Sequence, residues 1–132
     1  MIDTDVRTAN DELIRSGYDA FAAGDLTAVE ALFDPDAIWH AQRLGLLSGD
    51  HTGWPAIAEF FGRTMQLTGG IFSVTIEDVL TNDTGAAAIV RSRGERDGRR
   101  LDDRQVHLFR LDGGRVAEVW QFPGEGADAF WS

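Results

Sequence analysis

The stretch that decides the fold is LDDRQVHLFRLDGGRVAEVWQF, residues 101–122. Apolar and polar side chains alternate on both sides of Asp112-Gly113-Gly114, which is typical of two antiparallel strands joined by a tight turn. Two further segments of strand character precede it, at 71–80 and 86–96, and each is followed by turn residues. The sequence therefore predicts a four-stranded antiparallel meander from residue 71 to residue 122.

Helical periodicity dominates the residues before the meander. Three helices and one additional strand are predicted there, at 11–23, 26–32, 55–67 and 37–41 respectively. Asp25 can cap the second helix and Pro55 suits the first turn of the third. Helices that precede a mainly antiparallel sheet make an α+β domain, which we expect to span residues 1–132.

Composition narrows the classes of function. The chain has 132 residues, 12 basic and 22 acidic side chains, a net charge of −10 and no cysteine. A chain of this length buries a core without disulfides, and the absence of cysteine excludes thiolate chemistry. The charge disfavours nucleic acid and anionic membranes as partners. Because the acidic N-terminus does not resemble a secretory signal and no apolar stretch could span a bilayer, we expect a cytoplasmic protein. The three histidines lack metal-ligand spacing, so we expect neither a metal nor a cofactor.

Five segments along nearly the whole chain carry a family resemblance: 18–26, 32–40, 48–53, 106–111 and 114–120. In their order and spacing they resemble the SnoaL-like branch of the NTF2-like, ketosteroid-isomerase-like superfamily. The resemblance implies a cone-shaped α+β barrel that encloses an apolar pocket, commonly as a homodimer. It leaves the reaction open, because polyketide cyclases, isomerases, dehydratases, epoxide hydrolases and binding modules share this fold.

Strand alternation decides which side chains face the pocket. Gln105, His107 and Phe109 share one face of their strand. If Asp112-Gly113-Gly114 forms a three-residue loop, His107 lies opposite Val119 and Gln105 opposite Gln121, and all of these residues share a face that we expect to point inward. A loop of two or four residues would instead exchange the residues of the last strand between the two faces.

The opposite face of these strands is also apolar. It carries Val106, Leu108, Trp120 and Phe122, together with Glu118. An apolar surface that extends over several strands is rarely left in water. We therefore expect this outer face to form a homodimer interface.

Two histidines are the candidate catalytic residues. By resemblance, His107 falls where ketosteroid isomerases carry a proton-donating aspartic acid, and His40 lies close to the position of their base. Strict alternation would place Trp39 and not His40 on the pocket face, so a pocket-facing His40 requires a bulge. The isomerase base aligns with Ala41 and the acid of SnoaL-type cyclases with Gln121, which puts both of those known mechanisms in doubt. A hydrogen-bonded core histidine is the alternative interpretation of His107.

Aromatic side chains and two amides are predicted to contact the ligand. This set comprises Tyr18, Trp39, Trp54, Phe60, Gln105, Phe109, Val119, Gln121 and Trp131. Phe130 and Trp131 are expected to fold back over the pocket or onto a partner subunit. The hypothesis is acid/base chemistry on a small hydrophobic carbonyl compound, by cyclisation, isomerisation or dehydration. The alternatives are a binding module without catalysis, or an epoxide hydrolase-like activity using Asp103.

Overall fold

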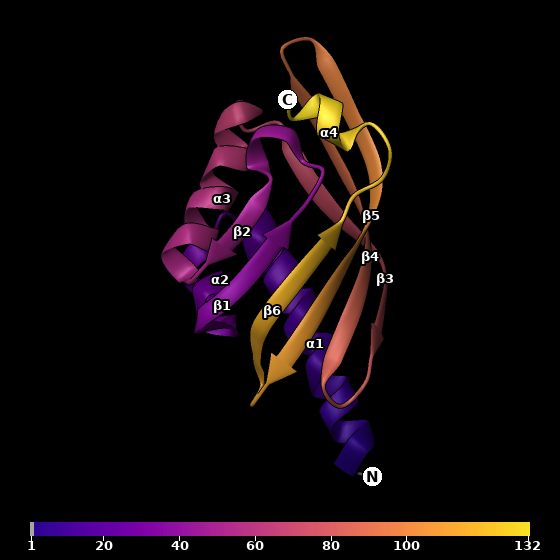
Figure 1. Cartoon of the computed structure of the whole chain (residues 1–132). Coiled ribbons are helices and arrows are strands. Elements are labelled where there is room, and N and C mark those ends of the chain that lie inside the picture. The colour runs from indigo at the N-terminus through magenta and orange to yellow at the C-terminus, as the bar shows by residue number, and fades with distance from the viewer. Residues whose placement is uncertain (1) are drawn as a thin grey trace.

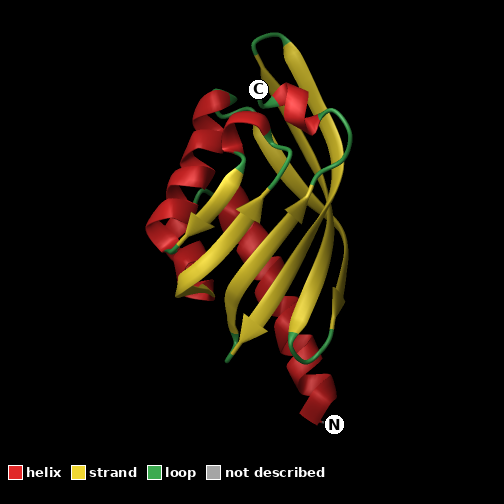
Figure 2. Ribbon diagram, in the orientation of Figure 1, coloured by secondary structure: helices red, strands yellow, loops and turns green. Residues whose placement is uncertain are grey.

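Helices cover one face of a twisted six-stranded sheet in the computed structural model, which describes residues 2–132 and the side chains from residue 5 onward (Figure 1, Figure 2). The helices are α1 (Ile2–Ala22), α2 (Leu26–Leu32), α3 (Trp54–Leu67) and α4 (Ala127–Phe130), with a 3₁₀ helix η1 (Gly45–Leu47). The strands are β1 (Phe33–Ala41), β2 (Gly49–Thr52), β3 (Phe72–Thr81), β4 (Gly85–Arg96), β5 (Arg99–Asp112) and β6 (Arg115–Phe122). None of the helices in this described range is long and apolar enough to cross a membrane.

The strand order is β2-β1-β6-β5-β4-β3, so the predicted meander of β3 to β6 is confirmed. β1 joins it by pairing parallel to β6, and β2 adds an antiparallel edge. The sheet is mixed and stays open between its edge strands β2 and β3, so the cone-shaped barrel that the resemblance implies is not a closed one. β2 was not predicted, because its four residues, Gly49 to Thr52, lack an apolar alternation. The expected α+β architecture is confirmed.

The three predicted helices are present, but α1 begins nine residues before its predicted start at residue 11. Its first half carries few apolar side chains and is positioned by hydrogen bonds instead. Asn10, which is buried, donates from Nδ2 to the carbonyl of Asn82 at 2.9 Å, and Thr81 donates to the carbonyl of Arg7 at 3.2 Å. This half of α1 is therefore held by the β3–β4 turn, a contact that has no signature in the local sequence.

The hairpin between β5 and β6 departs from its predicted geometry twice. Its loop has two residues, Gly113 and Gly114, both with positive φ, as type I′ turns require. A bulge then follows, because Leu111 pairs with Val116 while the preceding Arg110 pairs with Glu118. Each departure shifts the pairing of β6 with β5 by one residue. Because side chains alternate between the two faces, two such shifts return the side chains of β6 to the faces predicted for them.

The individual strand partners in this hairpin were nevertheless predicted wrongly. His107 lies opposite Gln121, and Phe109 lies opposite Val119. All four of these side chains, and Gln105 with them, are buried on the face that the helices cover. The predicted inward face is therefore confirmed.

The segment after β6 folds back across one end of the molecule, as predicted for Phe130 and Trp131, which are both buried (Figure 1). The backbone N–H of Leu46 donates to the carbonyl of Trp131 at 2.8 Å, and Arg96 donates to the carbonyls of Phe130 and Ser132 at 3.1 and 2.6 Å. Gly45 is required beneath it, because a Cβ there would lie 2.4 Å from the carbonyl carbon of Trp131. Hydrogen bonds from η1 and from β4 therefore hold this segment in place.

Candidate functional site

A cavity of about 90 Å³ lies between the helices and the inward face of the sheet. Most of the residues predicted to contact a ligand line it, namely Tyr18, Trp39, Phe60, Gln105, His107, Phe109, Gln121 and Trp131. Its walls are otherwise almost entirely apolar, with contributions from α1, α3 and η1. A cavity with apolar walls and a few polar groups is the usual form of a small-molecule site.

Two of the predicted ligand contacts do not line the cavity. Val119 is completely buried within the core on β6. Trp54 packs its ring against Phe33 and Phe61, with centroids 5.5 and 6.2 Å apart, and so supports the cavity wall from behind. Both residues have the predicted apolar character, but neither reaches the ligand space.

His40 points away from the cavity, so the predicted acid/base pair with His107 is wrong. The pairing of β1 with β6 is continuous from Ile38 to Ala41, and the only irregularity in it lies earlier, between Phe33 and Ile38. No bulge therefore turns His40 inward, and strict alternation places it on the outer face. This is the arrangement that the strand period favours.

On the outer face, His40 lies between two carboxylates. Its Nδ1 is 2.7 Å from Asp50 Oδ1, its Nε2 is 2.5 Å from Glu118 Oε2, and its ring stacks on Trp120. Partial burial lowers the pKa of His40, but the hydrogen bonds to the two carboxylates outweigh this and raise the pKa overall. Donation from His40 in turn lowers the pKa of Glu118.

A chain of polar side chains runs along the floor of the cavity on β5. The Tyr18 hydroxyl lies 2.5 Å from His107 Nδ1, and His107 Nε2 lies 3.0 Å from Gln105 Oε1. Gln105 Nε2 donates to Asp103 Oδ2 at 2.9 Å. The chain therefore connects a phenol at the cavity surface to a buried carboxylate.

Hydrogen bonds from Trp39 to Gln121 and from Gln121 to Gln105 help to determine the direction of every hydrogen bond in this chain. The Trp39 indole can only donate, so Gln121 Oε1 accepts from it at 2.9 Å, and Gln121 Nε2 donates to Gln105 Oε1 at 2.8 Å. Asp103, as a carboxylate, can only accept from Gln105. Because Gln105 must then present its oxygen to His107, the imidazole carries its proton on Nε2 and its Nδ1 accepts from Tyr18.

Burial shifts the pKa values of the first two groups of this chain, Tyr18 and His107. It lowers the pKa of His107 to about 3, and it raises the pKa of Tyr18 well above its ordinary value. At neutral pH, a neutral imidazole therefore accepts a hydrogen bond from a protonated phenol. Titratable groups with displaced pKa values in an apolar cavity are typical of functional sites.

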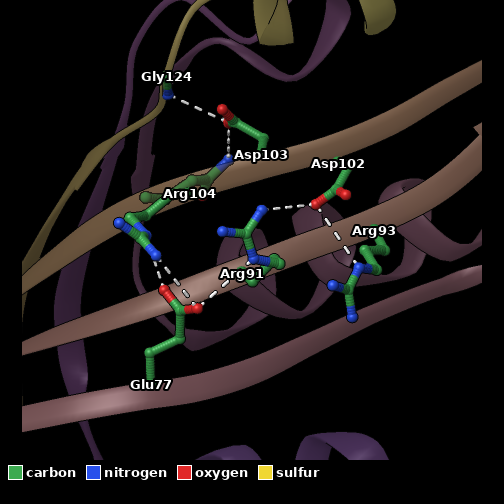
Figure 3. A network of polar contacts seen from close by, with 8 residues as sticks. Glu77, Arg91, Arg93, Asp102, Asp103, Arg104 and Gly124 are labelled. Carbon is green, nitrogen blue, oxygen red and sulfur yellow. Dashed lines mark hydrogen bonds and ion pairs between the residues drawn. The ribbon is translucent and has the colours of Figure 1, made fainter.

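Asp103 is held on the inner side of β5 by the backbone. Gly124 donates its N–H to Asp103 Oδ2 at 3.1 Å, and a Cβ on Gly124 would lie 2.2 Å from Asp103 Oδ1 (Figure 3). A side chain at residue 124 would thus displace the carboxylate that ends the chain. Sequence reasoning placed Asp103 on the correct face, but the contact with Gly124 left no sequence signal beyond the glycine itself.

Next to Asp103 in Figure 3 is a separate group of ion pairs on the outer face of the sheet. Glu77 lies between Arg91 and Arg104, and Asp102 lies between Arg91 and Arg93. These charges are largely open to solvent, where such pairs contribute little individually. The arginines of this part of the sheet are thus paired with carboxylates on the outer face, opposite the face that carries the inner polar chain.

Ser92 is a cavity residue that the sequence analysis missed. It lies on β4 opposite Asp103, lines the cavity and is only 1% exposed. The signal was present in the alternation of β4, where Ala88, Val90 and Ser92 share the inward face. Within the part of the chain that the structure describes, no group of three or more histidine, aspartate or glutamate side chains could hold a metal ion.

The structure is an α+β domain with a largely apolar cavity between its helices and its sheet. The SnoaL-like domain matches residues 14–119, and the protein belongs to this SnoaL-like family. An uncharacterized protein of Mycobacterium tuberculosis is 33% identical over 124 residues, which cover 92% of this chain and 95% of that protein. A protein of Mycobacterium bovis, also uncharacterized, has the same identity and coverage.

Solved structures agree with this assignment. Bal32a, from a soil-derived mobile gene cassette, is 35% identical with a TM-score of 0.93, covering 96% of this chain and 99% of its own. A putative SnoaL-like polyketide cyclase from Jannaschia is 18% identical with a TM-score of 0.80, covering 96% of this chain and 94% of its own. The second similarity shows a shared fold.

Proposed function

We propose that this protein is an enzyme that transfers protons on a small, largely apolar carbonyl compound, with Tyr18 and His107 as its catalytic residues. The observation that carries the proposal is the hydrogen bond from the Tyr18 hydroxyl, at the cavity surface, to the neutral imidazole behind it. Cyclisation, isomerisation and dehydration of such compounds all need a group that removes and returns a proton.

In the proposed step, the Tyr18 oxygen takes a proton from the carbon next to the substrate carbonyl while its own proton moves to His107 Nδ1. The resulting imidazolium donates from Nε2 to Gln105, whose amide is aligned by Asp103. The proton then returns along the same path to another atom of the substrate. One proton enters and one leaves, so no oxidant or other reactant is required.

The low pKa of His107 is compatible with this role. Its value of about 3 lies some four units below neutral pH, so protonating the imidazole costs about 5 kcal/mol at pH 7. Turnover at about 1–1,000 per second corresponds to a barrier of about 13–17 kcal/mol. Protonation of the imidazole therefore takes up about a third of such a barrier, and removal of the proton from carbon must fit within the rest. The imidazolium is a strong acid that readily returns its proton.

Exchange of α-protons in D₂O tests the proposal without knowledge of the natural substrate. Acetophenones, whose single aromatic ring suits a cavity of about 90 Å³, are incubated with the protein in D₂O. Loss of the α-proton signal is followed by NMR. We expect the wild type to accelerate exchange and both Tyr18→Phe and His107→Gln to lose this acceleration by about a hundredfold or more. His40→Gln, which changes the same residue type on the outer face, is the matched control and should retain it. Unchanged exchange in both cavity variants would contradict the proposal.

Ligand binding without turnover is the second candidate function. It is favoured by one specific feature, which is that His107, Gln105, Gln121 and Asp103 already satisfy one another. A cavity whose polar groups are paired internally can simply hold an apolar ligand. Binding of a ketone with no acceleration of exchange would favour this function. The epoxide hydrolase-like alternative is less suited, because Asp103 is buried behind the chain and does not line the cavity.

We also propose that the outer face of the sheet forms a homodimer. Val106 and Phe122 are cross-strand partners there, as are Leu108 and Trp120, and three of these four side chains are more than a third exposed. The Arg110–Glu118 ion pair borders this apolar patch at one end, and Arg104 lies two residues before Val106 on the same side of β5 at the other. Sedimentation velocity should show a dimer for the wild type and a monomer for Leu108→Glu, and a monomeric wild type at high concentration would contradict the proposal.

A further inference from the structure

The hydroxyl of Ser92 is a polar feature of the cavity that the proposed chemistry does not use. Ser92 is 1% exposed and lines the same cavity as Tyr18 and His107. Among the described residues, none forms a hydrogen bond with its hydroxyl. By contrast, Thr64, another hydroxyl residue of the lining, donates to the carbonyl of Phe60 at 2.9 Å.

The Ser92 hydroxyl is open to the cavity and not sealed in the core. No described side-chain nitrogen or oxygen is both completely covered and without a partner. The oxygen of Ser92 has no partner, so it must contact open space, and the alternation of β4 directs it inward. A buried hydroxyl without a hydrogen bond is costly unless something enters the cavity to satisfy it.

Ser92 and the Tyr18 hydroxyl meet the sheet at different positions along β5. Ser92 pairs with Asp103, which is four residues from His107 on the same strand, a separation of about 13 Å at about 3.3 Å per residue. Tyr18 is hydrogen-bonded to His107. The cavity therefore presents the hydroxyl groups of Tyr18 and Ser92 at two separate places in its lining.

We infer that Ser92 is a second polar anchor, which selects ligands with an oxygen at each end of a flat, apolar body. The inference rests on the proposed function, which places the ligand carbonyl at Tyr18. With each hydrogen bond about 2.8 Å long, the backbone separation of about 13 Å leaves room for ligand oxygens about 7 Å apart. A single aromatic ring with a carbonyl group and a para hydroxyl group has this spacing and suits a cavity of about 90 Å³.

A pair of probes of matched size tests the second anchor. 4-Hydroxyacetophenone and 4-methylacetophenone differ only at the end that would meet Ser92. Their dissociation constants are measured by NMR titration for the wild type and for Ser92→Ala. Ser73→Ala, which removes an exposed serine from β3, is the matched control.

The wild type should bind the hydroxyl probe about three- to tenfold more tightly than the methyl probe. In Ser92→Ala the order should reverse, because the hydroxyl would then be buried without a partner. Ser73→Ala should keep the wild-type order. Since the result is a ratio within each variant, a general loss of stability does not imitate it.

The outcomes separate this inference from the proposed function. Tyr18→Phe should weaken both probes about equally, whereas Ser92→Ala should affect only their order. If the preference for the hydroxyl probe is absent, or is unchanged in Ser92→Ala, the second anchor is overturned while the Tyr18 site stands. If the wild type binds neither ketone, the ligand class and this inference are both overturned.

Discussion

Replacing Tyr18 by phenylalanine removes only the hydroxyl that donates to His107. The ring remains to pack edge-to-face against Phe109, with centroids 6.3 Å apart. His107 is 4% exposed, so its Nδ1 then loses its hydrogen bond inside the core. A buried acceptor left without a partner costs about 1–3 kcal/mol. We expect Tyr18→Phe to lower the free energy of unfolding at pH 7 by that amount.

A double-mutant cycle with His107→Leu isolates this contribution. In the His107→Leu background no nitrogen is left unsatisfied, and the tyrosine hydroxyl itself lacks a partner. Tyr18→Phe should therefore be neutral or stabilising there, which gives a coupling energy of about 1 kcal/mol or more by urea unfolding. Equal costs in the two backgrounds, with a coupling below about 0.5 kcal/mol, would refute the hydrogen bond and the tautomer derived from it.

Three further predictions concern other parts of the molecule. Because the pKa of His40 is raised in the folded protein, the charged imidazole contributes its full stabilisation below the ordinary pKa of 6.5, and this stabilisation is lost as the pH rises through the raised pKa. The difference in free energy of unfolding between the wild type and His40→Gln should therefore shrink from pH 6 to pH 9. Gly45→Ala should weaken the docking of Trp131 and speed amide exchange there, whereas Gly24→Ala, also at positive φ but without a close neighbour, should not. Asp103→Asn can keep both hydrogen bonds on Oδ2 while losing the charge, so it should cost only about 1–2 kcal/mol by urea unfolding.

The face of the sheet that forms the cavity could be predicted from the sequence, but the pairing within it could not. Alternation along β5 assigns Gln105, His107 and Phe109 to one side whatever the turn does. The position of β6 depends on the Gly113-Gly114 loop and on the bulge that follows. Two glycines fit several loop lengths, and a bulge has no clear local signature, so the correct inward face of β6 resulted from two compensating departures.

The error at His40 has a different cause. The resemblance to ketosteroid isomerases favoured a pocket position for it, while the strand period placed it outside with its neighbour Trp39 inside. The period was correct, because the register of β1 is set by continuous pairing with β6 and not by the chemistry of one side chain. The carboxylates that surround His40, Asp50 and Glu118, come from two other strands, so their contact with it depends on tertiary structure.

The polar chain itself could be predicted only in part. Its members on β5 follow from alternation, but the contribution of Tyr18 depends on how α1 crosses the sheet. The anchor at Gly124 depends on the path of the chain after β6. Ser92 could have been predicted, since it alternates with buried apolar residues, but serine in a strand is common and its missing partner is visible only in three dimensions.

The most direct test of the account is the protonation of the His107 ring, measured by two-dimensional ¹⁵N–¹H NMR of the histidine side chains between pH 5 and 8. The chain has three histidines, so spectra of His107→Gln and His40→Gln complete the assignment. The account predicts that His107 stays neutral over this range, with its proton on Nε2 and with Nδ1 accepting a hydrogen bond, as a pKa of about 3 requires. A His107 signal that titrates near the ordinary histidine value, or that shows the proton on Nδ1, would contradict it.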